Sequence, residues 1–398
     1  MKKHALTAVI LLFFTVGWQF RPSSADVVRF GKFYLYDQTL YVSELTRGVR
    51  QIDIAAASNP TDLGLINIEE NHDNALFSTM LGRRILYADS RTDLLVFDVT
   101  NPASPKVLDT LKNIFGQSYA MRWGNEILFS TPDVMPVLND RVGGSSGCHG
   151  CEDFRSVAPT SGSDLRSTAE GLDTKGAGSG AGRAGSMARF AIVDNYLYCV
   201  DYSQLYVFEI DDPAEPRFIG RIDVGWGIET IFPYGEYLFI GGQNGMFIYS
   251  RSDPRNPQHV STFEHVRACD PVVVEDTLAY VTLRGGTRCG TVVSGLHIVT
   301  VADLFKPRLL VSYPLPQPMG LDVRNNIAYV CDDSSGVFIL DTSDPKNIRE
   351  LSRITEKPGY DTMLENGVLI VVNENAVSFY DVAQPDAPYL VGRFQLPA

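Results

Sequence analysis

Four carboxylates stand near the beginning of segments that recur along the chain, and their spacing suggests one shared site. Glu229 and Asp270 each lie ten residues before the centre of a short apolar triplet, Asp361 lies nine before the corresponding Ile370, and Asp322 falls about two residues further along. Carboxylate oxygens are the ligands that Ca²⁺ prefers, and repulsion between neighbouring acids favours a counter-ion. If the fold brings these acids together, they predict a site for calcium or another cation.

Two basic residues offer a second interpretation of the same acids. Lys32 and Arg189 occupy positions in other repeats that are equivalent to those of the acids. They would then neutralise the carboxylates internally and leave a salt-linked structural rim without a metal. Both interpretations stay open, and calcium is the one cofactor that the sequence suggests.

The motif Cys148-His149-Gly150-Cys151 has the spacing of a redox or metal motif. Haem attachment requires a His directly after the second Cys, where Glu152 stands. A zinc site requires two more ligands, and no second pair lies nearby. A thioredoxin-type pair normally begins a helix, which this glycine-rich stretch does not offer. A local disulfide between Cys148 and Cys151 is therefore favoured, with metal binding and redox chemistry as alternatives.

The other four cysteines divide by their surroundings. Cys269 and Cys289 flank a predicted hairpin in turn-like sequence, and a disulfide between them would staple the loop at 284–295. Cys199 and Cys331 stand in apolar strand segments. We expect those two thiols to be buried and unreactive.

No motif of established catalytic chemistry occurs in the chain. There is no nucleophile elbow, no His-Glu-x-x-His, no phosphate-binding loop and no dinucleotide glycine fingerprint, and the six histidines are scattered singly. The chain carries 34 basic and 47 acidic residues, a formal charge of −13, over 398 residues that are 44% hydrophobic. Such a globular chain is repelled by phosphate backbones and anionic membranes, so nucleic acid is not an expected partner.

The first 25 residues read as a signal peptide. Lys2 and Lys3 precede an apolar run that is too short to cross a bilayer, and Ser23-Ser24-Ala25 is small at the positions that a signal peptidase recognises. No later segment approaches the roughly 20 apolar residues of a transmembrane helix. We expect residues 26–398 to form a single exported domain that is periplasmic, extracellular or associated with the cell surface.

The elements that must position the acids recur along the whole mature chain. Each unit contains an apolar triplet, a second β-like run that ends in an acid or hydroxyl, an Asn-Pro or Asp-Pro turn, and further short apolar runs. Four short strands per unit of roughly 42 residues are typical of a β-propeller blade. The fold is therefore predicted to be all-β, with the innermost strands lining a channel. The triplets are centred on Tyr41, Tyr87, Phe129, Tyr198, Phe239, Tyr280, Tyr329 and Ile370.

The acids that close the second run follow the repeat, so we expect structural roles for them. A short carboxylate at this position accepts backbone N–H groups in the turn that follows. These acids are Asp53, Asp98, Glu209, Asp341 and Asp381.

Eight triplets favour eight blades, and seven is the alternative if one unit merges with its neighbour. The third unit has a first hairpin over Ser118–Ser130 but no second half, and the interval after it is about 27 residues longer than usual. This gap holds an insertion over about 132–186, rich in Gly, Ser and Ala, which we expect to be flexible. Residues 27–30 are available to pair near the C-terminal unit and close the ring.

The repeat unit itself resembles a known family. Leu95–Pro105 (LVFDVTNPASP), Tyr206–Pro216 (YVFEIDDPAEP) and Ser378–Val382 (SFYDV) are similar to the LVIVD repeat of bacterial surface and secreted proteins. The resemblance covers nearly all of residues 30–396. It implies a β-propeller and a location outside the cytoplasm, and it implies no settled activity.

Two functions from different classes are compatible with these features. The favoured one is a binding or interaction propeller without catalysis, whose partner is a protein or a small-molecule or carbohydrate ligand at a face or in the channel. The alternative is a calcium-dependent, lactonase-like hydrolase that uses the carboxylates at the channel mouth. Propeller enzymes build their sites from several blades, so sequence motifs do not reveal them.

Overall fold

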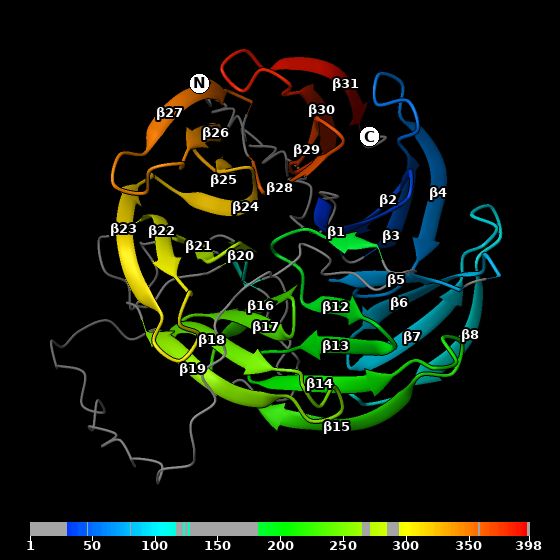
Figure 1. Ribbon diagram of the computed structural model, residues 1–398. Helices are drawn as coiled ribbons and strands as arrows, with labels where there is room; N and C mark the ends of the chain where they lie inside the picture. Colours follow the sequence, from blue (N-terminus) through cyan, green and yellow to red (C-terminus); the bar gives the residue numbers. More distant parts are fainter. Residues whose placement is uncertain are drawn as a thin grey trace, which may run out of the picture.

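The computed structural model describes residues 30–45, 47–79, 81–116, 182–264, 271–284, 294–356 and 359–395, together with the backbone of 122–123 and 126–127. Within these ranges the chain is all-β and forms a ring of antiparallel blades of four strands (Figure 1). In each blade the first strand lies nearest the axis and the last lies on the outside. The predicted propeller is therefore confirmed.

Four consecutive strands make up each blade. The first blade contains β1 (Phe30–Tyr36), β2 (Thr39–Glu44), β3 (Gly48–Asp53) and β4 (Thr61–Asn67), and the second contains β5 (Asn74–Ser78), β6 (Arg84–Ser90), β7 (Asp93–Asp98) and β8 (Lys106–Leu111). The third contains β12 (Phe190–Val193), β13 (Tyr196–Val200), β14 (Gln204–Glu209) and β15 (Arg217–Asp223), and the fourth contains β16 (Ile228–Tyr234), β17 (Tyr237–Gly242), β18 (Gly245–Ser250) and β19 (Gln258–Glu264). The fifth contains β20 (Val272–Glu275), β21 (Leu278–Leu283), β22 (Gly295–Thr300) and β23 (Arg308–Pro314). The sixth contains β24 (Pro318–Arg324), β25 (Ile327–Asp332), β26 (Gly336–Asp341) and β27 (Arg349–Ile354), and the seventh contains β28 (Asp361–Glu365), β29 (Val368–Val372), β30 (Ala376–Asp381) and β31 (Tyr389–Gln395).

The described residues form seven blades, so the favoured prediction of eight is wrong and the stated alternative holds. Of the hairpin predicted over Ser118–Ser130, the described residues include β9 (Arg122–Trp123) and β10 (Glu126–Ile127), which pair in a separate two-stranded sheet, and the triplet around Phe129 lies outside them. The inner strands β5 and β12 pack against each other, and Leu76 and Phe190 belong to one hydrophobic cluster. The second and third blades are therefore neighbours, and no further blade stands between them in the ring.

Two features of the repeat belong to one contact between neighbouring blades. The hydroxyl of Tyr87, at the centre of its triplet, donates to the carbonyl of Pro213 in the next blade at 2.8 Å. Tyr198 donates in the same way to the carbonyl of Pro254 at 2.9 Å. Burial raises the pKa of both tyrosines far above the ordinary value, so each hydroxyl stays protonated and can donate. At these two places the triplet tyrosine of one blade therefore binds the Asp-Pro turn of the next, whereas the hydroxyl of Tyr280 contacts that of Thr342 at 3.2 Å.

The acids that end the third strands shape the turns, as predicted for four of the five. Their carboxylates accept the backbone N–H two residues further on, as in Asp53 to Ala55 at 2.9 Å and Asp98 to Thr100 at 3.0 Å, and Asp341 and Asp381 do the same. Glu209 differs, because its side chain accepts the Tyr196 hydroxyl at 3.3 Å and pairs with arginines.

Packing of the first blade against the seventh closes the ring. The Phe30 N–H donates to the carbonyl of Glu374 at 2.8 Å, and the rings of Phe30 and Phe394 lie 6.4 Å apart. The strands β1–β4 of the first blade and β28–β31 of the seventh each come from one continuous stretch of chain. Residues 27–29, expected to pair near the C-terminal unit, lie outside the described residues.

Candidate binding site in the central channel

An additional strand occupies the channel of the propeller. β11 (Arg183–Ala184) pairs antiparallel with β1 on the inner edge of the first blade, with Ala184 opposite Tyr34 (Figure 1). The hydroxyl of Tyr34 donates to the carbonyl of Gly182, and the Gly185 N–H donates to the carbonyl of Phe33, both at 3.0 Å. We call residues 182–189 the channel segment. Composition predicts that residues 182–186 belong to the flexible insertion, but the structure shows them hydrogen-bonded inside the ring.

Small residues are required where the channel segment meets Asp361. A Cβ atom on Gly185 would lie 2.3 Å from Oδ2 of Asp361 and 2.8 Å from the ring of Phe33. A Cβ atom on Gly320, on the neighbouring strand β24, would lie 2.0 Å from Oδ1 of the same carboxylate. Glycine at 185 in the channel segment and at 320 on β24 therefore has a steric cause.

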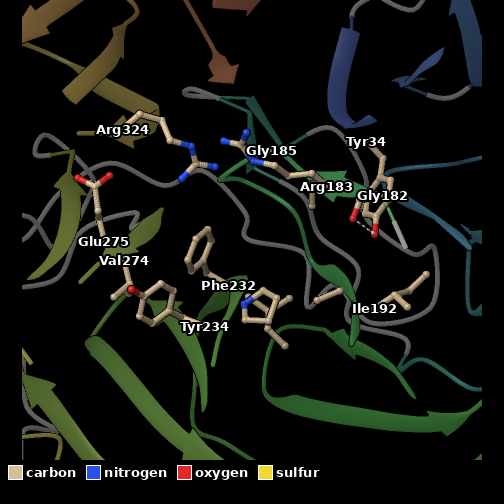
Figure 2. A pocket seen from close by; sticks show the side chains of 14 residues that line it. Tyr34, Gly182, Arg183, Gly185, Ile192, Phe232, Tyr234, Val274, Glu275 and Arg324 are labelled. Atoms are coloured by element: carbon tan, nitrogen blue, oxygen red, sulfur yellow. Dashed lines mark hydrogen bonds between the residues drawn. The ribbon is translucent and has the colours of Figure 1, made fainter. Parts of the chain in front are cut away.

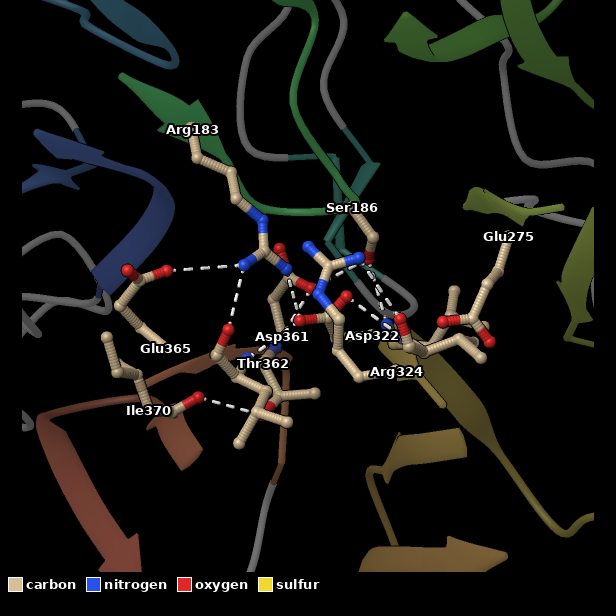
Figure 3. A network of polar contacts seen from close by, with 12 residues as sticks. Arg183, Ser186, Glu275, Asp322, Arg324, Asp361, Thr362, Glu365 and Ile370 are labelled. Carbon is tan, nitrogen blue, oxygen red and sulfur yellow. Dashed lines mark hydrogen bonds and ion pairs between the residues drawn. The ribbon is translucent and has the colours of Figure 1, made fainter. Parts of the chain in front are cut away.

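The carboxyl group of Asp361 is buried and held by the channel segment (Figure 3). The Ser186 hydroxyl donates to Oδ1 at 2.7 Å, and the Met187 N–H donates to Oδ2 at 3.2 Å. Ser186 in turn accepts the N–H of Leu321 at 2.8 Å, which links the sixth and seventh blades through one hydroxyl. Burial raises the pKa of Asp361 to about 7, although these hydrogen bonds favour its ionised form.

Asp322 is buried beside Asp361 and forms an ion pair with Arg183 of the channel segment. Its Oδ2 also accepts the N–H of Leu364 at 2.7 Å. The Arg183 guanidinium donates to the carbonyl of Leu364 at 2.8 Å and lies 3.4 Å from the carboxylate of Glu365. One arginine from the channel segment thus joins the inner strands of the sixth and seventh blades (Figure 3).

The structure brings together two of the four acids predicted to share a cation. Asp322 and Asp361 are neighbours, as expected, and both are engaged by the channel segment. Glu229 lies on β16, where it accepts the side-chain amide of Gln243 at 3.0 Å, and Asp270 falls outside the described residues. In the described part of the chain, no three His, Cys, Asp or Glu side chains are grouped as metal ligands.

The two predicted counter-charges lie in another part of the channel. Nζ of Lys32 lies 3.7 Å from Oδ2 of Asp73, and the backbone N–H of Arg189 donates to the same oxygen. Burial lowers the pKa of Lys32 to about 7 and raises the pKa of Asp73 to about 6, while their mutual attraction opposes both shifts. Lys32 therefore balances mainly Asp73, an acid that the sequence analysis did not single out, and the charge of Glu229, one of the predicted acids, also raises the pKa of Lys32.

A buried polar cluster adjoins this pair. Oδ1 of Asp89 accepts the backbone N–H groups of His72 and Asp73 at 2.7 and 2.9 Å and the Asn71 amide at 2.9 Å. Burial opposes ionisation of Asp89, but its hydrogen bonds and attraction to His72 lower its pKa below the ordinary value. The sequence feature that could have revealed this cluster is the polar run Asn71-His72-Asp73-Asn74 at the start of an inner strand. Sequence reasoning missed it because the repeat is defined by its apolar positions.

The cysteine predictions are tested only in part. Cys199 and Cys331 are buried free thiols, and burial raises the pKa of each well above its ordinary value, as expected for unreactive packing residues. Cys148, Cys151, Cys269 and Cys289 lie outside the described residues, so their two disulfides stay predictions.

A cavity of about 160 Å³ lies in the channel beside the channel segment (Figure 2). Its wall is mostly apolar and comes from the inner strands of the third, fourth and fifth blades, with polar groups at Tyr34, Arg183, Glu275 and Arg324. The apolar part includes Ile192, Ile231, Phe232, Pro233, Tyr234 and Val274.

Arg324 is positioned by the turn that follows it. Asn325 and Asn326 have φ values of 53° and 61°, the left-handed conformations of a tight hairpin turn, which Asn tolerates well. The carboxylate of Glu275, in the neighbouring blade, accepts the N–H groups of both at 2.7 and 2.9 Å. The Arg324 guanidinium donates to the carbonyl of Val323 at 3.2 Å, and it forms no ion pair with any described residue. Figure 2 shows Arg324 and Arg183 extending toward one another beside the cavity.

Sequence reasoning missed Arg324, although a signal was present. The last residue of each inner strand stands directly before the turn, and only one of the seven is basic. In chain order these residues are Tyr36, Ser78, Val193, Tyr234, Glu275, Arg324 and Glu365. Comparison of this position across repeats would have singled out Arg324. The contacts of Arg183 had no such signal, because β11 belongs to no repeat.

The family model of the LVIVD repeat matches residues 86–111, 184–224 and 318–356. These matches lie in the second, third and sixth blades and include the triplets centred on Tyr87, Tyr198 and Tyr329. The chain carries LVIVD repeats. This LVIVD-repeat propeller therefore has the repeat that its sequence resembles, in the fold that the resemblance implied. A search of the curated proteins finds no match.

Solved structures resemble the LVIVD-repeat propeller in fold at low sequence identity. A protein from Lactobacillus plantarum is 11% identical with a TM-score of 0.58, covering 92% of this chain and 97% of that one. A periplasmic gluconolactonase from Pseudomonas aeruginosa is 9% identical with a TM-score of 0.57, covering 93% and 96%. The computationally designed Ika8 protein is 8% identical with a TM-score of 0.54, covering 93% and 88%. These likenesses show the fold alone. Within the described ranges, no helical segment has the length and hydrophobicity of a membrane span.

Proposed function

We propose that this LVIVD-repeat propeller is an exported binding protein without catalytic activity, and that it takes a small molecule in the channel cavity. The observation that carries the proposal is the cavity itself, a mostly apolar space with a few polar groups at the axis of a rigid ring. Small-molecule sites in proteins have this character. Export rests on the basic, apolar and small-residue pattern of residues 1–25.

The contacts of the channel acids support binding over hydrolysis. A calcium-dependent hydrolase would need open carboxylate oxygens. Asp322 is paired with Arg183, and Asp361 accepts hydrogen bonds from Ser186 and Met187. A guanidinium already supplies positive charge at this point, which weakens the case for a metal there. A hydrolase that uses Glu229, Asp270, Asp322 and Asp361 around Ca²⁺ stays the alternative.

Methyl NMR of the mature protein tests the binding proposal. Ile192 and Ile231 line the cavity, whereas Ile219 and Ile348 lie on the outer strand β15 and in the turn before β27. During titration with a panel of small aromatic and branched aliphatic compounds, the methyl signals of Ile192 and Ile231 should shift in a saturable way, while those of Ile219 and Ile348 stay fixed. A panel that moves neither cavity methyl would reject the channel cavity as the binding site.

A further inference from the structure

The size of the channel cavity limits the body of its ligand. An engineered protein cavity of about 150 Å³ with apolar walls binds benzene. The channel cavity, at about 160 Å³, has a comparable volume, and Phe232 and Tyr234 contribute aromatic wall. A single aromatic ring or a short branched aliphatic chain would therefore fill the cavity, whereas a disaccharide is too large for it.

The polar side of the cavity offers hydrogen-bond donors more than acceptors. A guanidinium carries five N–H donors in a planar fork. One N–H group of Arg324 donates to the carbonyl of Val323, and no carboxylate of the described residues pairs with this arginine. Its charge lies close enough to the Tyr234 hydroxyl to lower the pKa of that group, against the larger effect of burial. Arg324 thus faces the same space as the aromatic wall.

The other charged groups at the cavity are engaged elsewhere. Arg183 is held by Asp322, Glu365 and the carbonyl of Leu364. Both oxygens of Glu275 accept backbone N–H groups of the turn after Arg324. The two acids at the last positions of the neighbouring inner strands, Glu275 and Glu365, are therefore occupied by the turn and by Arg183. Among the charged groups of the described cavity wall, Arg324 remains the one with donors to offer a ligand.

We infer that the cavity binds a small carboxylate whose body is a single ring or a short branched chain, with its carboxylate paired to Arg324. This assignment rests on the proposed binding function and adds the ligand class to it. A carboxylate matches the guanidinium fork with two parallel hydrogen bonds, and charge-assisted pairs of this kind are about twice as strong as neutral ones. Placing the acid at the turn leaves the apolar body against Phe232 and Ile192.

Isothermal titration with three probes that share one phenyl ring and differ in charge tests the ligand class. Benzoate carries the carboxylate, benzamide is its neutral counterpart, and benzylamine carries the opposite charge. We expect benzoate to bind about ten-fold or more tightly than benzamide, and benzylamine to bind most weakly. Equal affinity for benzoate and benzamide, or tighter binding of benzylamine, would overturn the assignment.

Substitution of Arg324 tests the residue. R324Q should reduce the affinity for benzoate about ten-fold and leave that for benzamide within about two-fold. R308Q, on the exposed outer strand β23, should change neither. R324K, which keeps the charge without the fork, is expected to bind benzoate with intermediate affinity and guards against a folding defect in R324Q. Unchanged benzoate affinity in R324Q would contradict the role of this arginine.

The outcomes of these experiments distinguish a wrong ligand class from a wrong binding function. Binding of benzamide or benzylamine in preference to benzoate, with shifts at Ile192 and Ile231, would reject the carboxylate and keep the cavity. If none of the three probes binds and no compound of the wider panel moves those methyl signals, both the ligand class and the proposed binding function are rejected.

Discussion

Asp361 is the carboxyl group on which the channel contacts converge. It is buried, it accepts hydrogen bonds from Ser186, Met187 and Thr362, and glycines at 185 and 320 make room for it. Such a group is costly to ionise without partners, because burial penalises the charged form. The channel segment provides those partners.

The shifted pKa of Asp361 makes stability depend on pH. Burial raises this pKa from 3.8 to about 7 in the folded protein. Between these values the folded state holds a proton that the unfolded state has lost, so stability falls as pH rises through this range, by up to about 1.4 kcal/mol per pH unit. Asp73, with its pKa raised to about 6, acts in the same direction.

D361N should remove the contribution of one proton from this slope. Urea unfolding measured at several pH values between 4 and 7 gives the slope for each protein. We expect a shallower fall in the variant, with the part due to Asp73 retained. An identical slope in both proteins would show that Asp361 titrates normally.

At the scale of single residues, the sequence predicted where the channel acids lie better than it predicted which groups bind them. Asp322 and Asp361 were expected to converge because the repeat places them on adjacent inner strands, and they do. Their partners Arg183 and Ser186 lie in a stretch without periodicity, so no pattern could have paired them. The role of the two acids therefore depended on a tertiary contact that repeat analysis does not reveal.

At the scale of secondary-structure elements, the repeat encodes both the blade and its link to the next. The turn acids and the Asp-Pro prolines were identifiable because they recur at fixed offsets. The tyrosine contact to Pro213 or Pro254 was not, because it joins residues from different repeats. The prediction of an eighth blade rests on a triplet around Phe129, which lies outside the described residues, whereas the described blades number seven. One apolar hairpin is insufficient evidence for a blade of four strands.

Removal of a triplet hydroxyl should weaken the contact between blades. Y87F and Y198F each delete one hydrogen bond to a proline carbonyl, and we expect each to lower the free energy of unfolding by about 0.5–1.5 kcal/mol. Y237F is the matched control, because Tyr237 lies on β17 at a position outside the triplet centre. Chemical denaturation compares the three, and an equal loss in Y237F would contradict a specific contact.

The channel segment should tolerate no added bulk at Gly185. G185A places a methyl group against Asp361 and Phe33, so we expect a loss of roughly 1–3 kcal/mol of unfolding free energy. G220A, on the outer strand β15, has open space at the equivalent atom and should be nearly neutral. Stability curves that coincide for G185A and the native chain would mean that the segment does not pack in the channel as described.

At the scale of the whole molecule, the centre of the ring contains both the channel segment, which links blades, and a cavity. The channel segment joins the first, sixth and seventh blades, and the cavity lies beside it against the third, fourth and fifth. Composition and repeats predicted the frame. Neither could predict the cavity, because its walls come from inner strands of several blades and its volume depends on what else enters the channel.

Calcium should leave the stability of the molecule unchanged if the channel acids are already neutralised. A cation that binds the folded state raises the melting temperature as its concentration exceeds its dissociation constant. We expect equal melting temperatures in chelator and in millimolar Ca²⁺. A clear rise that D361N abolishes would favour the calcium-dependent hydrolase instead.

A crystal structure of the mature protein grown with both benzoate and calcium present tests the central claim most directly. The binding proposal predicts electron density for benzoate against Phe232, with its carboxylate at Arg324, while Arg183 keeps its ion pair with Asp322. A cation coordinated by Asp322 and Asp361, with Arg183 displaced and the cavity without benzoate, would contradict it.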